Sequence, residues 1–326
     1  LLNNSKKEDL KKIDEELSKL SPQFSQNQLN SMNEFEYYTK DEIDLDGLPD
    51  SALEAAKHLA MSKDKKEGWL FNLQMTSMIP ILKYANNRSL RKKFSEAYAK
   101  VATKGKFDNS KIIKKIATLR FERSNLLGFK NHAEYVLKKR MAEIPKRVFD
   151  FLDQFYEVSM PAAKNDFDEL KKLAKETDNI DDFQSWDAAY YSEKLIKLKF
   201  DFNSEEFRPY FKMENVLDGI FTVAHKMYGL NFNQIDDVDI YHEDVKVFEV
   251  HGEQQNFIGL LYLDLFPRET KRPGAWMTTY QKQGLFNGEI RRPLVSIVAS
   301  LTPATDTKPS LLTFDEVRTI FHEFGH

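Results

Sequence analysis

The chain has 326 residues, of which 30% are charged and 41% hydrophobic, so it can bury a sizeable core beneath a charged surface. Its formal net charge of −3, with Lys and Arg spread among acidic residues, gives no indication of a nucleic-acid or membrane-surface partner. The lack of cysteine excludes a disulfide framework, a thiol nucleophile and cysteine-ligated zinc. The apolar runs are too short to span a bilayer, and the opening LLNNSKKEDLKK lacks the pattern of a signal peptide.

Helical periodicity dominates the chain up to about residue 230. It predicts helices over residues 90–101, 112–128, 131–141, from 145 onward, 186–200 and 215–228. Gly128 and Gly229 are predicted helix ends, and Asn131 is a predicted N-cap. Pro145 suits a first helical turn, whereas Pro161 is expected to kink or divide the helix that follows.

The pattern changes to short β-prone runs from about residue 239. Strands are predicted over residues 245–250, 257–265 and 294–298, with Gly, Pro and Asn turn residues between them. The sequence therefore predicts a small sheet embedded in a mainly helical protein. We expect an N-terminal helical region over residues 1–86 and a catalytic domain over residues 87–326.

The last predicted helix begins with its own start signal. Thr313 and Glu316 have the spacing of a capping box, with Thr as N-cap and Glu at the third helical position. An apolar stripe on this helix is expected to pack into the core, namely Phe314, Val317, Phe321 and Phe324. A neighbouring stripe is polar and contains Asp315, Thr319, His322 and His326.

The same helix carries His322, Glu323 and His326 in the pattern HExxH. Residues four apart lie about 40° apart around a helix, so both imidazoles can face one zinc ion. Glu323 is turned about 100° from His322, where it can act as general base towards water that the metal activates. Chance predicts roughly 0.02 His-acid-x-x-His matches for this composition, so a structural pair of surface histidines is the weaker interpretation.

The other histidines lack a partner at ligand spacing and are interpreted as surface or structural residues: His58, His132, His225, His242 and His251. Trp276, Tyr190 and Tyr191 are expected in the core or in a cleft wall.

The surroundings of this motif resemble the thimet-oligopeptidase-like zinc peptidases (family M3), most closely their bacterial peptidyl-dipeptidases. The resemblance rests on "DLDGLPDSALEAAK", "NHAEYVLKKRMAEIPKRVFDFLDQF", "GLLYLDLFPRETKRPGAWMTTY" and "KPSLLTFDEVRTIFHEFGH". It implies a mainly α, zincin-type peptidase with a small β-sheet beside a deep channel, here lacking its C-terminal part. It also implies one Zn²⁺ held by His322 and His326, with Glu323 as catalytic base and short peptides as substrates.

The resemblance further implies that the strand after Pro293 lies alongside the bound peptide. The family's Cys-Asn-Phe on that strand is replaced here by Ala299, Ser300 and Leu301. Its third zinc ligand is a Glu on a downstream helix, its oxyanion-stabilising groups are also downstream, and its first helices precede Leu1. We therefore expect these 326 residues alone to be inactive.

Three functional interpretations follow from this resemblance. The first is release of C-terminal dipeptides, and the second is endo-acting cleavage by an oligopeptidase of the same family. The third is a catalytically incomplete fragment that only binds peptide. We expect no nucleic-acid or membrane partner, a monomer completed by the missing C-terminal part, and a cytoplasmic location, with the periplasm as the alternative.

Overall fold

The structure, a computed structural model, describes residues 2–305 and 307–326. The chain forms two compact units, each built from two stretches of sequence. The first contains the residues up to Phe35 together with Arg91–Leu195, and the second contains Glu36–Leu90 and Ile196–His326. Among the described residues, no helix combines the length and the apolar character that a membrane span requires.

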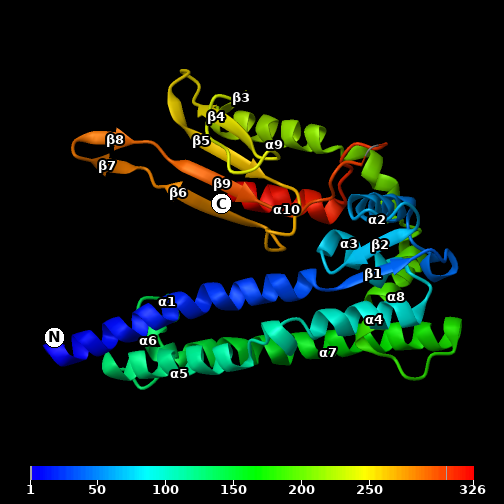
Figure 1. Ribbon diagram of the computed structural model, residues 1–326, viewed down its shortest axis with the longest axis horizontal. Helices are drawn as coiled ribbons and strands as arrows, with labels where there is room; N and C mark the ends of the chain where they lie inside the picture. The colour runs from blue at the N-terminus through cyan, green and yellow to red at the C-terminus, as the bar shows by residue number, and fades with distance from the viewer. Residues whose placement is uncertain (1, 306) are drawn as a thin grey trace. The chain divides into compact units, whose positions relative to one another are not determined.

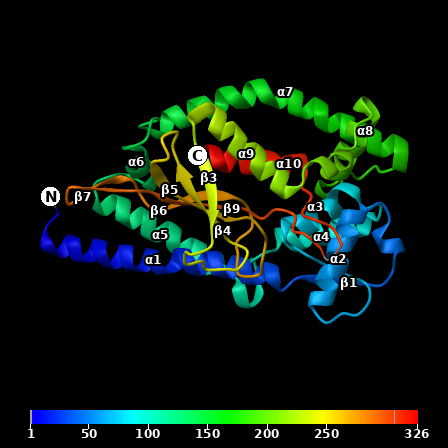
Figure 2. The same ribbon diagram turned by 90° about the horizontal axis from the view of Figure 1, so that it is seen from above.

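The first unit is helical (Figures 1 and 2). Its helices are α1 (Asn4–Asn33), most of α4 (Arg88–Ala99), the short 3-10 helix η2 (Gly105–Phe107), α5 (Ser110–Leu126), α6 (His132–Leu137), α7 (Pro145–Asp178) and most of α8 (Ser185–Phe200). α1 packs along α5, and a separate small core joins α7 to α8 through Leu173, Ala174, Tyr190 and Tyr191. The two tyrosines are therefore core residues, as predicted.

Two predictions in this unit need correction. Pro161 does not divide α7, which continues as one helix of 34 residues, since proline removes a single backbone donor (Figure 2). α6 begins as predicted, with the Asn131 side chain accepting from the Glu134 N–H, but it ends at Leu137 rather than Met141. The chain must turn before Pro145, and the preceding Ile144 is extended while Glu143 adopts a φ of 60°.

The second unit combines helices and strands. Its early segments are β1 (Glu36–Thr39), η1 (Ile43–Leu45), α2 (Asp50–Ser62), β2 (Trp69–Asn72) and α3 (Met75–Tyr84). Its later segments are η3 (Ser204–Tyr210), α9 (Met213–Tyr228), β3 (Asn231–Ile235), β4 (Lys246–His251), β5 (Phe257–Asp264), β6 (Trp276–Gln281), β7 (Gly284–Phe286), β8 (Glu289–Arg291), β9 (Leu294–Val298) and α10 (Phe314–Gly325). α9 ends at Gly229 with a φ of 67°, which confirms that helix end.

The main sheet has five strands in the order β3-β4-β5-β9-β6 (Figure 1). β5 and β9 are parallel and the other neighbours are antiparallel. One face of the sheet packs against α9 and α10 around Leu217, Ile220, Leu263, Ile297 and Ile320. The three predicted strands correspond to β4, β5 and β9, while β1, β2, β3, β6 and the β7–β8 hairpin had not been predicted.

Candidate active site

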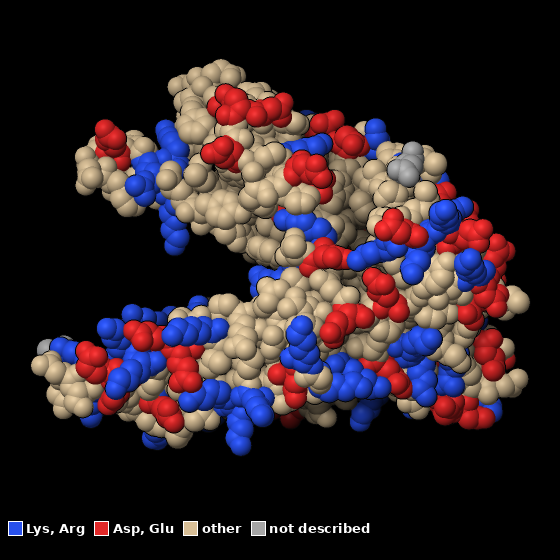
Figure 3. Space-filling view, in the orientation of Figure 1, with Lys and Arg blue, Asp and Glu red and all other residues tan. Residues whose placement is uncertain are grey.

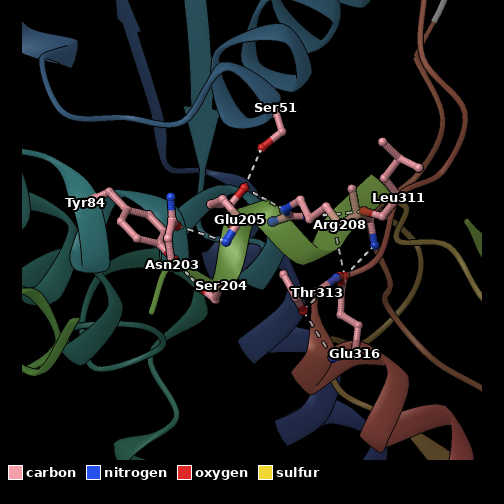
Figure 4. Close-up of polar contacts among 10 residues, drawn as sticks. Ser51, Tyr84, Asn203, Ser204, Glu205, Arg208, Leu311, Thr313 and Glu316 are labelled. Atoms are coloured by element: carbon pink, nitrogen blue, oxygen red, sulfur yellow. Dashed lines mark hydrogen bonds and ion pairs between the residues drawn. The ribbon is translucent and has the colours of Figure 1, made fainter. Parts of the chain in front are cut away.

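The start of α10 has the capping box that the sequence predicts. The Thr313 hydroxyl accepts the Glu316 N–H at 3.1 Å, and the Glu316 Oε2 accepts the Thr313 N–H at 2.7 Å. Both residues appear in Figure 4. Two of the backbone donors that a helix start leaves unpaired are thereby satisfied.

The second carboxylate oxygen of Glu316 binds the loop that follows β9. Glu316 Oε1 accepts the Thr302 N–H at 2.6 Å and the Thr302 hydroxyl at 2.9 Å. The Thr302 carbonyl in turn accepts the Ser310 hydroxyl at 2.6 Å. One carboxylate therefore holds both ends of the connection between β9 and α10.

Arg208 of η3 anchors the same connection to the rest of its unit (Figure 4). Its Nη1 donates to the Leu311 carbonyl at 3.0 Å, and its Nε donates to Glu205 Oε2 at 2.6 Å. The Ser51 hydroxyl of α2 donates to that carboxylate oxygen at 3.1 Å. Since Arg208 is only 9% exposed, these charge-assisted bonds are poorly screened by solvent and fix where α10 begins.

The buried face of α10 differs from the predicted stripe. Ile320 is 1% exposed, and Val317 and Phe324 pack against the same core. Phe314 and Phe321 are exposed, because the core meets the helix along positions 317, 320 and 324, which share one side at helical spacing. The predicted core positions Phe314 and Phe321 were therefore wrong.

His322 lies in the last turns of α10, His326 is the C-cap residue directly after it, and both are exposed. Their ring centroids are 4.8 Å apart, with an angle of 87° between the ring planes. Two imidazoles on one tetrahedral zinc, with Zn–N bonds of about 2.0–2.1 Å, place their centroids about 5 Å apart. The spacing of the two rings therefore fits a shared zinc ion.

Glu323, between the two histidines in sequence, is only 9% exposed. Its backbone lies one helical step from His322, so the carboxylate leaves the helix in a different direction from the imidazoles. Within residues 2–305 and 307–326, no group of three His, Cys, Asp or Glu side chains gathers to hold a metal. The described chain thus supplies two nitrogen ligands, one fewer than the usual protein ligand set of a catalytic zinc.

The sheet beside α10 offers one unexpected edge. β9 is hydrogen-bonded to β5 on one side and to β6 on the other, so a peptide cannot pair with the strand after Pro293. β6 lies at the end of the strand order, and it contacts α10. Among the described strands, β6 is therefore the edge available to an added strand next to the histidine helix, and a peptide alongside β9 would not be held by pairing with β9 itself.

The residues directly after β9 belong to the core of the second unit. The Ala299 N–H donates to the Asp264 carbonyl at 2.8 Å and the Leu301 N–H to the Leu265 carbonyl at 2.9 Å. Both side chains are buried in the core against α9 and α10. The intervening Ser300 hydroxyl is buried and has no hydrogen-bond partner among the described residues.

Sequence reasoning missed β6 and its flanking cations. Trp276 begins β6, and the Arg272 guanidinium lies over its indole ring at 5.0 Å. The available signal was the β-prone run WMTTYQ, which begins one residue after the turn-forming pair Pro273-Gly274. The second unit also contains a cavity of about 220 Å³ between α2, α3 and residues 302–305, but His322, Glu323 and His326 do not line it.

Comparison with known proteins identifies relatives along nearly the whole chain. Residues 81–326 match Peptidase family M3. Oligopeptidase A of Escherichia coli is 38% identical over 316 residues, which are 95% of this chain and 46% of that protein. The organellar oligopeptidase A of Arabidopsis thaliana is 36% identical over 339 residues, covering all of this chain and 43% of its own length.

Dipeptidyl carboxypeptidase of Escherichia coli is 28% identical over 319 residues, which are 97% of this chain and 46% of that protein. The chain spans about half the length of the curated relatives it matches.

Proposed function

Because this chain belongs to peptidase family M3, we propose that it takes part in zinc-dependent hydrolysis of short peptides. The observation that carries the proposal is the pair of exposed imidazoles 4.8 Å apart on a capped helix, with Glu323 between them. His322 and His326 would hold the zinc, and Glu323 would be the catalytic base. A third ligand is needed for the usual catalytic set and is not among the described residues.

Zinc, when bound, would polarise the scissile carbonyl and make water more acidic. Glu323 would take a proton from the attacking water and deliver it to the leaving amine. The edge of β6 would hold the peptide backbone extended by strand addition, which orients the scissile bond without regard to side-chain identity. The Glu316 and Arg208 contacts would keep α10, and with it the two ligands, in a fixed position relative to that edge.

Two cleavage modes are compatible with this site. The 38% identity with an oligopeptidase A, against 28% with a dipeptidyl carboxypeptidase, favours cleavage within short peptides. The release of C-terminal dipeptides, which the sequence resemblance predicts, is the second candidate. A substrate with a blocked C-terminus separates them, because only the dipeptide-releasing mode requires a free terminal carboxylate.

The test uses the full-length protein and one short peptide in two forms, with a free and with an amidated C-terminus. Internal cleavage of both forms is expected from an oligopeptidase, whereas cleavage of the free form alone, with dipeptide release, identifies the second mode. The variant Glu323→Gln should lose at least about a hundredfold in kcat, as removal of a general base does. Turnover of this variant close to that of the wild type would refute the assignment of the base.

Peptide binding without turnover in the wild-type protein, measured in the same samples by fluorescence anisotropy, would instead support the peptide-binding interpretation.

A further inference from the structure

The edge strand β6 and the hairpin that extends it form a positively charged stretch. Residues 272–292 contain four cations, Arg272, Lys282, Arg291 and Arg292, and one acid, Glu289, which gives a net charge of +3 in a chain whose net charge is −3. The β7–β8 hairpin projects beyond the main sheet in Figure 1, and Figure 3 shows Lys and Arg side chains on this projecting arm. We call residues 272–292 the cationic edge.

In the part of the chain that the structure describes, the cations of this edge have no ion-pair partner. Among the residues that the structure describes, none of the four side chains forms an ion pair, and Arg272, Lys282 and Arg291 are exposed. Nearby cations behave differently, since Arg268 and Lys271 both bind the buried carboxylate of Asp264. The net charge of +3 on the edge is therefore not neutralised by ion pairs with the described residues of its unit.

Aromatic rings hold two of these cations in place. The Arg272 guanidinium lies 5.0 Å from the centre of the Trp276 ring, and the Arg291 guanidinium lies 4.0 Å from that of Phe286. Such contacts orient a guanidinium without neutralising it and leave its N–H groups for an oxygen ligand. The two arginines are therefore partly preorganised to meet carboxylates.

A peptide paired with the edge of β6 would also lie beside the cations of the cationic edge. An extended peptide added to β6 has its side chains in register with those of the edge strand. β6 has six residues and extends over about 20 Å, and the hairpin continues beyond it. A terminal carboxylate could meet cations at one point of this length only, whereas acidic side chains along the peptide could meet them at several points.

We propose that the cationic edge selects peptides that carry several acidic side chains. The proposal deepens the proposed peptidase function and rests on it, because β6 is the strand along which the substrate would lie. Arg272 would act at one end of β6, and Lys282, Arg291 and Arg292 would act at the other end and on the arm.

The test measures peptide binding to the full-length Glu323→Gln variant by fluorescence anisotropy. Three forms of one peptide are compared: an acidic form, a form with every Glu replaced by Gln, and the acidic form with an amidated C-terminus. We expect both acidic forms to bind about tenfold more tightly than the neutral form at low salt, because several exposed ion pairs add up. The difference should shrink towards 1 M salt, where screening is nearly complete.

The double variant Arg291→Gln/Arg292→Gln should remove most of this preference. The matched control is Lys226→Gln/Lys246→Gln, which removes the same charge from exposed cations on α9 and β4 of the same unit. The control should keep the preference.

Equal binding of acidic and neutral peptides would overturn the proposal, as would an equal loss in both double variants. A preference that disappears on amidation would identify the terminal carboxylate as the ligand and would also contradict it. These outcomes are distinct from failure of the proposed function: peptide cleavage by the wild type without acidic preference refutes only the selectivity. Acidic preference without cleavage refutes only the peptidase activity.

Discussion

At the end of β5, the buried carboxylate of Asp264 accepts hydrogen bonds from three side chains. Arg268 donates to both oxygens at 2.8 and 2.9 Å, and the Lys271 ammonium donates to Oδ1 at 2.9 Å. Lys271 also donates to the carbonyls of Asp264 and Phe266, so its three protons are all used. The Tyr241 hydroxyl completes the group at 3.1 Å from Oδ2.

This cluster determines the path of the chain from β5 to β6. Val298, the last residue of β9, pairs with Asp264 on one side and with Trp276 on the other. The connection between those two residues must therefore cross the end of β9, and Arg268 and Lys271 lie within it. The ion pairs thus position the start of the edge strand proposed to hold the peptide.

Acid should destabilise the protein through Asp264. Burial alone would raise the pKa of this carboxyl, but the bonds from Arg268 and Lys271 outweigh it and lower the pKa to about 2. Because the folded pKa lies below the unfolded value, the carboxylate stabilises the fold above about pH 4 and loses this effect as the pH falls towards 2, by about 2 kcal/mol. Urea unfolding of the wild type and of Asp264→Asn between pH 7 and pH 2 measures this loss in the free energy of unfolding.

The Asn variant should be less stable at neutral pH and should lose less stability on acidification than the wild type. Parallel pH profiles for the two proteins would show that Asp264 does not contribute as described.

At the scale of elements, α10 shows which features depend on local sequence and which on tertiary contacts. The capping box of Thr313 and Glu316 could be predicted, since both residues and their bonds lie within one helical turn. The cap by Asn131 and the stop at Gly229 were predictable for the same reason, whereas the bounds of β9 were predictable from its β-prone run after Pro293. The position of Ile320 at the centre of the buried face could not be predicted from the local sequence. The packing of α9 and the sheet decides which side of α10 is covered.

The site shows the same division. Local spacing placed His322 and His326 on one helix stripe, and the structure brings their rings to 4.8 Å. By contrast, the edge position of β6 follows from the strand order β5-β9-β6, in which a strand late in sequence is inserted between two earlier ones. No local pattern in Trp276–Gln281 encodes that insertion.

Removing Glu316 should loosen the start of α10. Glu316→Ala eliminates the bond from the Thr313 N–H to the carboxylate and both bonds from Thr302, which together should lower the free energy of unfolding by about 2 kcal/mol, while the bond from the backbone N–H of residue 316 to the Thr313 hydroxyl can remain. The control Glu214→Ala removes an exposed first-turn carboxylate of α9, whose pair with Lys212 at 3.6 Å should contribute less than about 1 kcal/mol. Urea unfolding compares the two variants; equal destabilisation would contradict the role given to Glu316.

At the scale of the whole molecule, each unit has its own means of stabilisation. In the first unit, Arg91 and Asp187 form a buried ion pair at 3.1 Å, and the guanidinium lies 3.9 Å from the centre of the Tyr190 ring. In the second unit, the sheet, α9 and α10 share one apolar core. All residues assigned to the candidate site belong to the second unit. The regions 1–86 and 87–326, the monomeric state and the cytoplasmic location stay predictions.

Zinc analysis of the full-length protein tests the central claim most directly. The wild type should contain about one zinc ion per chain, and His322→Ala and His326→Ala should each lose most of it, because a catalytic zinc depends on every protein ligand. The control His225→Ala, whose ring nitrogen contacts the Leu230 carbonyl at 3.3 Å, should keep its zinc. Full zinc content in both site variants, or none in the wild type, would contradict the assignment of His322 and His326 as a zinc site.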